Sequence, residues 1–235
     1  MRLILEQLDV SGAVGAQIRC ADTGELFASL VDGSVGDEPL GAGWIDAIGE
    51  SPRVVVRCGE PLASTSGDTS GDEAGDAARW LTRWSQEGWT RFDEQVAELN
   101  KMVQEAGKEL IIRPSSEGML SDAICTLAWA RRFEDLGCSV LLDPVGWLVG
   151  SMMHDAQDHL QRIDEFCAQC PNVFAVLIRS VVVDEHGGLV EASLFEAERG
   201  EGAIEPNVIL KALSGVIESA PALAVLDRAD LDSFL

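Results

Sequence analysis

The sequence alternates short apolar runs with longer segments in which apolar residues recur every three or four positions. Each short run has the length of a buried strand and carries a charged residue at its last or next-to-last position; the runs span residues 54–58, 110–114, 140–144, 176–179 and 224–227. The longer segments have the period of helices that bury one face, over residues 90–106, 121–136, 151–167 and 206–217. Apolar strands alternating with such helices predict a parallel sheet covered by helices.

The first 35 residues follow a different pattern. Residues 17–20 and 25–31 indicate two strands of a hairpin, joined by an Asp-Thr-Gly turn, and residues 2–10 indicate a third strand. A second small hairpin is predicted outside the main sheet, around residues 181–190. No low-complexity linker divides the chain. We therefore expect a single domain over residues 1–235, with a β-hairpin region at 1–35 and a βα-repeat barrel portion at 40–235.

Four predicted strands end in arginine, at Arg19, Arg57, Arg113 and Arg179, although the chain has only 17 basic residues. Functional sites of parallel α/β folds lie at the carboxyl ends of the strands. If their strands are neighbours, Arg57, Arg113 and Arg179 converge at one mouth. Guanidinium groups there would bind a phosphate or carboxylate through bidentate hydrogen bonds. The alternative is that these arginines pair with internal carboxylates and form a buried polar plug.

Two further predicted strands end in carboxylates, Asp143 and Asp227. They are candidates for an acid/base pair, and equally the candidate partners of the arginines in a plug. Arginines beside them would repel a divalent metal and lower the carboxylate pKa values. We therefore expect neither a metal nor another cofactor.

Other candidate metal ligands have simpler interpretations. His154 and His159 each lie one helical turn from an aspartate, but away from the apolar stripe of their helix, which indicates a solvated face. Cys167 and Cys170 form a lone C-x-x-C at a helix end, without a second pair of ligands.

The net charge of −23 argues against nucleic acid and anionic membranes as partners, because both bind cationic surfaces. The N-terminal residues do not have the pattern of a signal peptide, and no apolar run reaches the length of a membrane helix. The six cysteines lie mostly apart, in apolar or helical contexts. A cytoplasmic protein with reduced thiols is the expectation.

The order of these segments resembles the xylose isomerase-like TIM barrels, the sugar phosphate isomerase/epimerase group, over roughly residues 40 to 235. The most specific segment begins Gly200-Glu-Gly-Ala-Ile-Glu and continues to Leu213, and it resembles the family's Gly-x-Gly-x-Ile-Asp segment before the final strand. Weaker likenesses lie at residues 53–59, 109–114, 140–144 and 174–180. The resemblance implies a degenerate or incomplete TIM-like (β/α) barrel that begins with the hairpin region.

The sequence departs from this family at the metal ligands that the resemblance implies. Arg57 stands where the family has a histidine, and Arg113 where it has a metal-binding glutamate. Asp143 is retained, but Leu177 and Ser180 replace a histidine and an aspartate. Metal catalysis is therefore not implied for this chain.

Three hypotheses follow. The first is a metal-independent relative of the isomerases, a pseudoenzyme that binds an anionic small molecule, a sugar phosphate or carboxylate, through Arg57, Arg113 and Arg179. The second is a protein-interaction scaffold with a plugged barrel, which meets its partner through its acidic surface or its Trp-bearing segment 80–89. The third is an isomerase that uses Asp143 and Asp227. An incomplete barrel would also expose strand edges, which a homodimer would cover.

Overall fold

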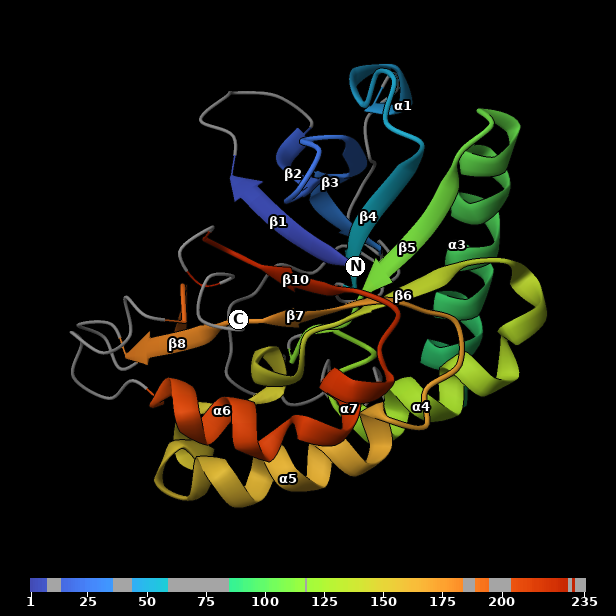
Figure 1. Cartoon of the computed structure of the whole chain (residues 1–235). Coiled ribbons are helices and arrows are strands. Elements are labelled where there is room, and N and C mark those ends of the chain that lie inside the picture. The colour runs from blue at the N-terminus through green and yellow to red at the C-terminus, as the bar shows by residue number, and fades with distance from the viewer. Residues whose placement is uncertain are drawn as a thin grey trace, which may run out of the picture.

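The structure, a computed structural model, describes residues 1–7, 14–35, 44–58, 85–116, 118–183, 189–194, 204–227 and 230. Eight strands form a closed barrel in the order β1-β10-β7-β6-β5-β4-β3-β2 (Figure 1). Their bounds are β1 Arg2–Gln7, β2 Val14–Cys20, β3 Leu26–Val35, β4 Arg53–Cys58, β5 Glu109–Arg113, β6 Ser139–Leu142, β7 Val173–Ile178 and β10 Leu223–Val225. With helices packed outside, the fold is the predicted TIM-like α/β barrel.

The N-terminal hairpin region is part of this barrel. Strand β2 runs antiparallel to both β1 and β3, whereas the other pairs of neighbours are parallel. Gly24, at φ +73°, turns the chain between β2 and β3 as the Asp-Thr-Gly sequence predicts. Strand β1 then pairs with β10, Arg2 beside Leu223, and closes the ring. The barrel is thus degenerate but closed. The homodimer stays a prediction, and it loses the argument from exposed strand edges because the closed barrel has none.

Most of the helices lie outside the strands, on the side of the barrel formed by β4 to β7 and β10, whereas the short helix that precedes β4 lies apart from them (Figure 1). Their bounds are α1 Trp44–Ala47, α3 Gln86–Glu105, α4 Ala123–Arg132, α5 Ala156–Cys167, α6 Pro206–Ala212 and α7 Ser214–Ser219. The 3₁₀ helices are η1 Glu134–Leu136, η2 Pro144–Trp147 and η3 Gly150–Asp155. No helix among these described segments is long and apolar enough to span a membrane.

Three helix boundaries in the structure differ from those that the apolar periodicity predicts. Helix α3 starts earlier than Thr90, because the Ser85 hydroxyl accepts a hydrogen bond from the Gly88 amide and caps it. The predicted helix 121–136 divides into α4 and η1, and Gly137 at φ +72° ends η1. The segment before Ala156 is 3₁₀ rather than α-helical.

Two apolar layers stabilise the barrel. One fills its interior and includes Leu3, Ile18, Val55, Ile111 and Leu177. The other lies between the outer faces of the strands and the helices. Strand residues alternate between the layers, since successive side chains point to opposite faces of a sheet.

A second, two-stranded sheet continues beyond the end of β7 (Figure 1). It consists of β8, Ser180–Val183, and β9, Leu189–Ala192, which pair antiparallel. This is the hairpin predicted outside the main sheet. A single residue, Arg179, separates β7 from β8, so the hairpin is held at the carboxyl end of a barrel strand.

Truncating one side chain in the barrel interior tests whether the interior apolar layer stabilises the fold. Ile111 is fully buried there, and Ile111→Ala should lower the free energy of unfolding by about 2–5 kcal/mol, the usual cost of a core cavity. Urea denaturation measures the loss. The matched control is Ile124→Ala on α4, because Ile124 is 58% exposed. Equal losses at the two positions would contradict a packed interior.

Candidate functional site

Strand alternation places four charged side chains at one end of the barrel. Each lies two residues after an apolar residue that points into the barrel, so it also points toward the barrel axis, closer to the carboxyl end of its strand. The pairs are Val55 and Arg57, Ile111 and Arg113, Leu141 and Asp143, and Leu177 and Arg179. Arg57 and Arg113 are direct partners in the register of β4 and β5. Because these strands are parallel, their carboxyl ends form one mouth.

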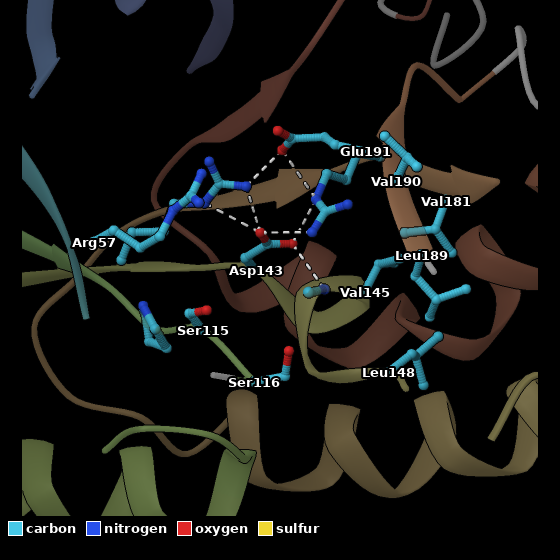
Figure 2. Close-up of a pocket in the computed structure, with 14 residues that line it drawn as sticks. Arg57, Ser115, Ser116, Asp143, Val145, Leu148, Val181, Leu189, Val190 and Glu191 are labelled. Atoms are coloured by element: carbon cyan, nitrogen blue, oxygen red, sulfur yellow. Dashed lines mark hydrogen bonds and ion pairs between the residues drawn. The ribbon is translucent and has the colours of Figure 1, made fainter. Parts of the chain in front are cut away.

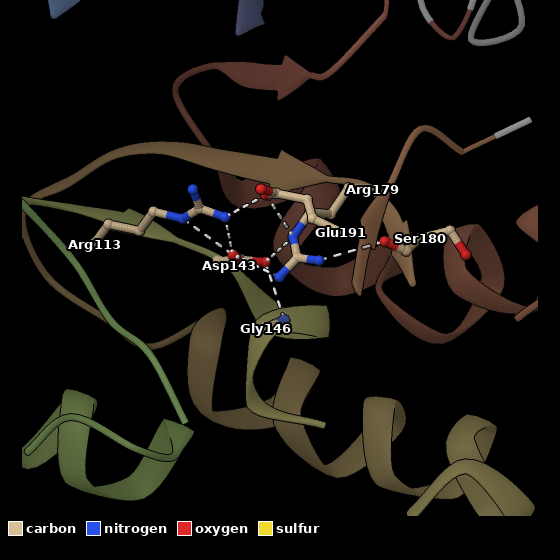
Figure 3. A network of polar contacts seen from close by, with 6 residues as sticks. All are labelled: Arg113, Asp143, Gly146, Arg179, Ser180 and Glu191. Atoms are coloured by element: carbon tan, nitrogen blue, oxygen red, sulfur yellow. Dashed lines mark hydrogen bonds and ion pairs between the residues drawn. The ribbon is translucent and has the colours of Figure 1, made fainter. Parts of the chain in front are cut away.

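The Asp143 carboxylate is the centre of this site and accepts five hydrogen bonds (Figure 3). Arg179 binds both oxygens, Nε to Oδ1 at 2.9 Å and Nη2 to Oδ2 at 3.0 Å. Arg113 donates Nε and Nη2 to Oδ2, at 3.1 and 2.6 Å. The Gly146 amide donates to Oδ1 at 3.0 Å. A side chain at residue 146 would put its Cβ 2.7 Å from Asp143 Cγ, so glycine is needed for this approach.

Glu191, on β9, adds a second carboxylate from outside the barrel sheet. Its Oε1 lies 2.5 Å from Arg113 Nη2 and 3.3 Å from Arg179 Nε. Arg179 also donates to the Ser180 carbonyl at 3.3 Å. Figure 3 shows both guanidinium groups between the two carboxylates, and a terminal nitrogen of Arg113 that points away from them. The bonds of Arg113 involve Nε and Nη2 alone, so Nη1 has no hydrogen-bond partner among the described residues.

Burial and the neighbouring positive charges have opposite effects on the pKa of Asp143. Burial alone would raise its pKa, but the charges of Arg179 and Arg113 and their hydrogen bonds lower the pKa to about 2. The pKa of Arg113 is raised, because attraction to Asp143 and Glu191 outweighs the loss of hydration. Asp143 and Arg113 are therefore both charged at neutral pH.

A cavity of about 320 Å³ opens above this network (Figure 2). Its lining residues are Arg57, Arg113, Pro114, Ser115, Ser116, Asp143, Val145, Gly146, Leu148, Arg179, Val181, Leu189, Val190 and Glu191. Arg113 and Arg179 are only 4% and 6% exposed. Arg57 is exposed and forms no ion pair with any described carboxylate. The cavity thus has a neutralised floor of buried ion pairs and one accessible cation on its wall.

The structure brings together Arg57, Arg113, Arg179 and Asp143. Asp227 is exposed and is not among the residues that line the cavity. Arg19 lies toward the opposite end of the barrel, because β2 runs against its neighbours; its guanidinium donates to the Gly24 carbonyl in the β2–β3 turn.

The other candidates stay apart from this site. His154 is exposed and His159 is half-buried, and among the described residues no group of three His, Cys, Asp or Glu side chains could hold a metal. Cys167 and Cys170 are free thiols with pKa values raised by burial. Trp80 and Trp84, of the Trp-bearing segment 80–89, lie outside the described residues.

Sequence reasoning missed Glu191, Ser115 and Ser116 in the lining of the cavity. The hydroxyls follow Arg113 and Pro114 directly, so their place after a strand end was a usable signal. Glu191 carried no such signal. Its role depends on how the β8–β9 hairpin folds back over the mouth, and strand periodicity does not contain that information.

Fold and site together define an α/β barrel with an arginine–carboxylate network at the carboxyl ends of its strands. Structure comparison finds the "IOLI protein with a binding zinc atom", with 12% identity and a TM-score of 0.40 over 80% of this chain. It also finds a "Xylose isomerase-like TIM barrel Protein from Mycobacterium smegmatis in Complex with Magnesium", with 16% identity and a TM-score of 0.38 over 87% of this chain.

The present chain spans 59% of the IolI chain and 67% of the mycobacterial chain. No protein-family model and no curated protein matches the sequence.

Removing the central charge tests the network. Asp143→Asn keeps the shape of the side chain but leaves two buried guanidiniums without their main counter-ion, so the free energy of unfolding at pH 7 should fall by about 3–5 kcal/mol. The lowered pKa also predicts acid sensitivity. The stability due to this carboxylate is present above its unfolded pKa of about 3.9 and is lost as pH falls through about 2.

The measurement is urea denaturation from pH 7 down to about pH 2, where the wild type and Asp143→Asn should converge. Asp135→Asn is the control, because Asp135 is an exposed carboxylate. A gap between the two curves that stays constant with pH would contradict the role given to the Asp143 charge.

Proposed function

We propose that this protein binds an anionic small molecule, a carboxylate or a sugar phosphate, at the barrel mouth. The observation that carries the proposal is the charge of the cavity lining, where three guanidiniums face two carboxylates. The excess positive charge is on Arg57, which is exposed and adjoins Arg113 in the sheet register. Two cations side by side repel one another, and an anion between them removes that repulsion.

The arginine donors of the site support a ligand with several acceptor oxygens. Arg113 Nη1 and the whole guanidinium of Arg57 are available for charge-assisted hydrogen bonds. Ser115 and Ser116 contribute hydroxyls to the same cavity, and Figure 2 shows both facing the space below Arg57. This arrangement suits an acidic group flanked by hydroxyl or carbonyl oxygens.

Asp143 acts in this proposal as a positioning residue. A carboxylate that accepts five hydrogen bonds and has a pKa near 2 is a poor base at neutral pH, since its lone pairs are engaged and its proton affinity is low. Asp227 does not line the cavity. The geometry therefore favours a binding protein, a pseudoenzyme, over an isomerase that uses these two carboxylates. Metal independence is supported by Arg57 and Arg113, which stand where the family resemblance implies metal ligands.

The second candidate is a plugged barrel that serves protein interaction. It is favoured by the mutual neutralisation of Arg113, Arg179, Asp143 and Glu191, which closes the floor of the mouth. The described part of the Trp-bearing segment adds little support. Trp89 is half-buried, packs edge-on against Phe92 and lies under the Arg132 guanidinium.

The two candidates differ in their response to anions. Millimolar phosphate, acetate or a hexose phosphate should raise the melting temperature of the wild type, because ligands that bind the native state stabilise it. Arg57→Gln should weaken binding by about 1.5–3 kcal/mol, the value of hydrogen bonds to a charged group, or roughly ten- to a hundredfold in Kd. Isothermal titration calorimetry measures this change.

Arg162→Gln on α5 is the matched control, because it removes one exposed arginine away from the cavity. It should bind anions as the wild type does. Equal weakening of anion binding in both variants would mean that the effect comes from the net charge of the protein and not from the cavity. The absence of a thermal shift with any anion, relative to sodium chloride at equal ionic strength, would favour the plugged barrel.

A further inference from the structure

Glu191 differs from the rest of the network in origin and exposure. Asp143, Arg113 and Arg179 stand on or directly after barrel strands and are nearly buried, whereas Glu191 comes from the β8–β9 hairpin, a separate sheet. Its side chain is 23% exposed, against 4% and 7% for the two arginine side chains that it contacts. It is therefore the outermost member of the network and borders the cavity.

Without Glu191, the two buried arginines would have one counter-ion for two charges. Asp143 already accepts five hydrogen bonds and cannot neutralise both. Arg113 Nη2 and Arg179 Nε converge on the position of Glu191 Oε1. Two guanidinium donors aimed at one point with one unit of uncompensated positive charge form a site for a single carboxylate.

The residues around the position of Glu191 Oε1 also restrict the chemical class of the ligand. Val181, Leu189 and Val190 line the cavity on the side of the hairpin, and Figure 2 shows them grouped together beyond Glu191. Val190 is 44% exposed, so it offers apolar surface that a ligand would cover. A carboxylate with a short aliphatic part would pair with the arginines and contact these side chains.

We infer that the Arg113–Arg179 pair is a carboxylate-binding site whose resident occupant is Glu191, and that a small aliphatic carboxylate replaces it. This inference rests on the proposed function and gives its ligand class. No bond is made or broken; one carboxylate exchanges for another. Glu191 competes with the ligand, so apparent affinity falls in proportion to the fraction of molecules in which the site is empty.

Removing the competitor tests the inference, with acetate and propionate as probes. Glu191→Ala should bind both more tightly than the wild type, by about tenfold if Glu191 occupies the site nine-tenths of the time. Its melting temperature should be below that of the wild type in chloride and should recover in acetate at equal ionic strength. Calorimetric titration and thermal unfolding give the two readouts.

A second variant covers the case in which Glu191→Ala does not fold. Glu191→Gln keeps the volume but binds the arginines less strongly than a carboxylate, so its acetate affinity should lie between those of the wild type and Glu191→Ala. The control is Glu218→Ala on α7, which removes an exposed glutamate away from the cavity and should bind acetate as the wild type does.

The outcomes separate this inference from the proposed function. Acetate affinities of the Glu191 variants equal to those of the wild type and Glu218→Ala would overturn the inference, even if the wild type binds anions through Arg57. Acetate binding by the wild type that Glu191→Ala strengthens but Arg57→Gln leaves unchanged would support the inference and overturn the role that the proposed function gives to Arg57.

Discussion

The ion pairs of Asp143 with Arg113 and Arg179 are the interaction on which the barrel mouth depends. Buried guanidiniums are tolerated only when opposite charges and hydrogen bonds replace their lost hydration. One carboxylate supplies most of this compensation for two arginines on different strands. The ends of β5, β6 and β7 are thereby held in a fixed relation, and the neighbouring cation, Arg57, is left available on the cavity wall.

Substitution at strand ends changes what such a barrel can select. Carboxylates and imidazoles at the mouth would favour a cation, whereas guanidiniums in the same positions favour an anion. Here a chain with a net charge of −23 concentrates positive charge where its strands end. The charge of the mouth is thus set by a few inward-facing side chains on a barrel frame.

Much of the barrel and part of the site could be predicted from the sequence. Apolar runs located the strands, because burial on both faces leaves an uninterrupted signal. The position of Arg57, Arg113, Arg179 and Asp143 at strand ends then placed them at one edge of the sheet. Arg19 also ends a predicted strand but lies apart from them, because β2 is antiparallel to its neighbours, and a run of residues does not reveal the direction of its strand. Glu191 could not be found, since its contacts depend on tertiary folding of a hairpin.

The seam between the first and last barrel strands has a consequence for synthesis of the chain. Strand β10 has three residues, and it is the parallel partner that β1 meets on its free side. Until residue 225 has been synthesised, β1 carries unpaired backbone groups along that edge. The nascent chain therefore has an open sheet edge, which can pair with a wrong strand.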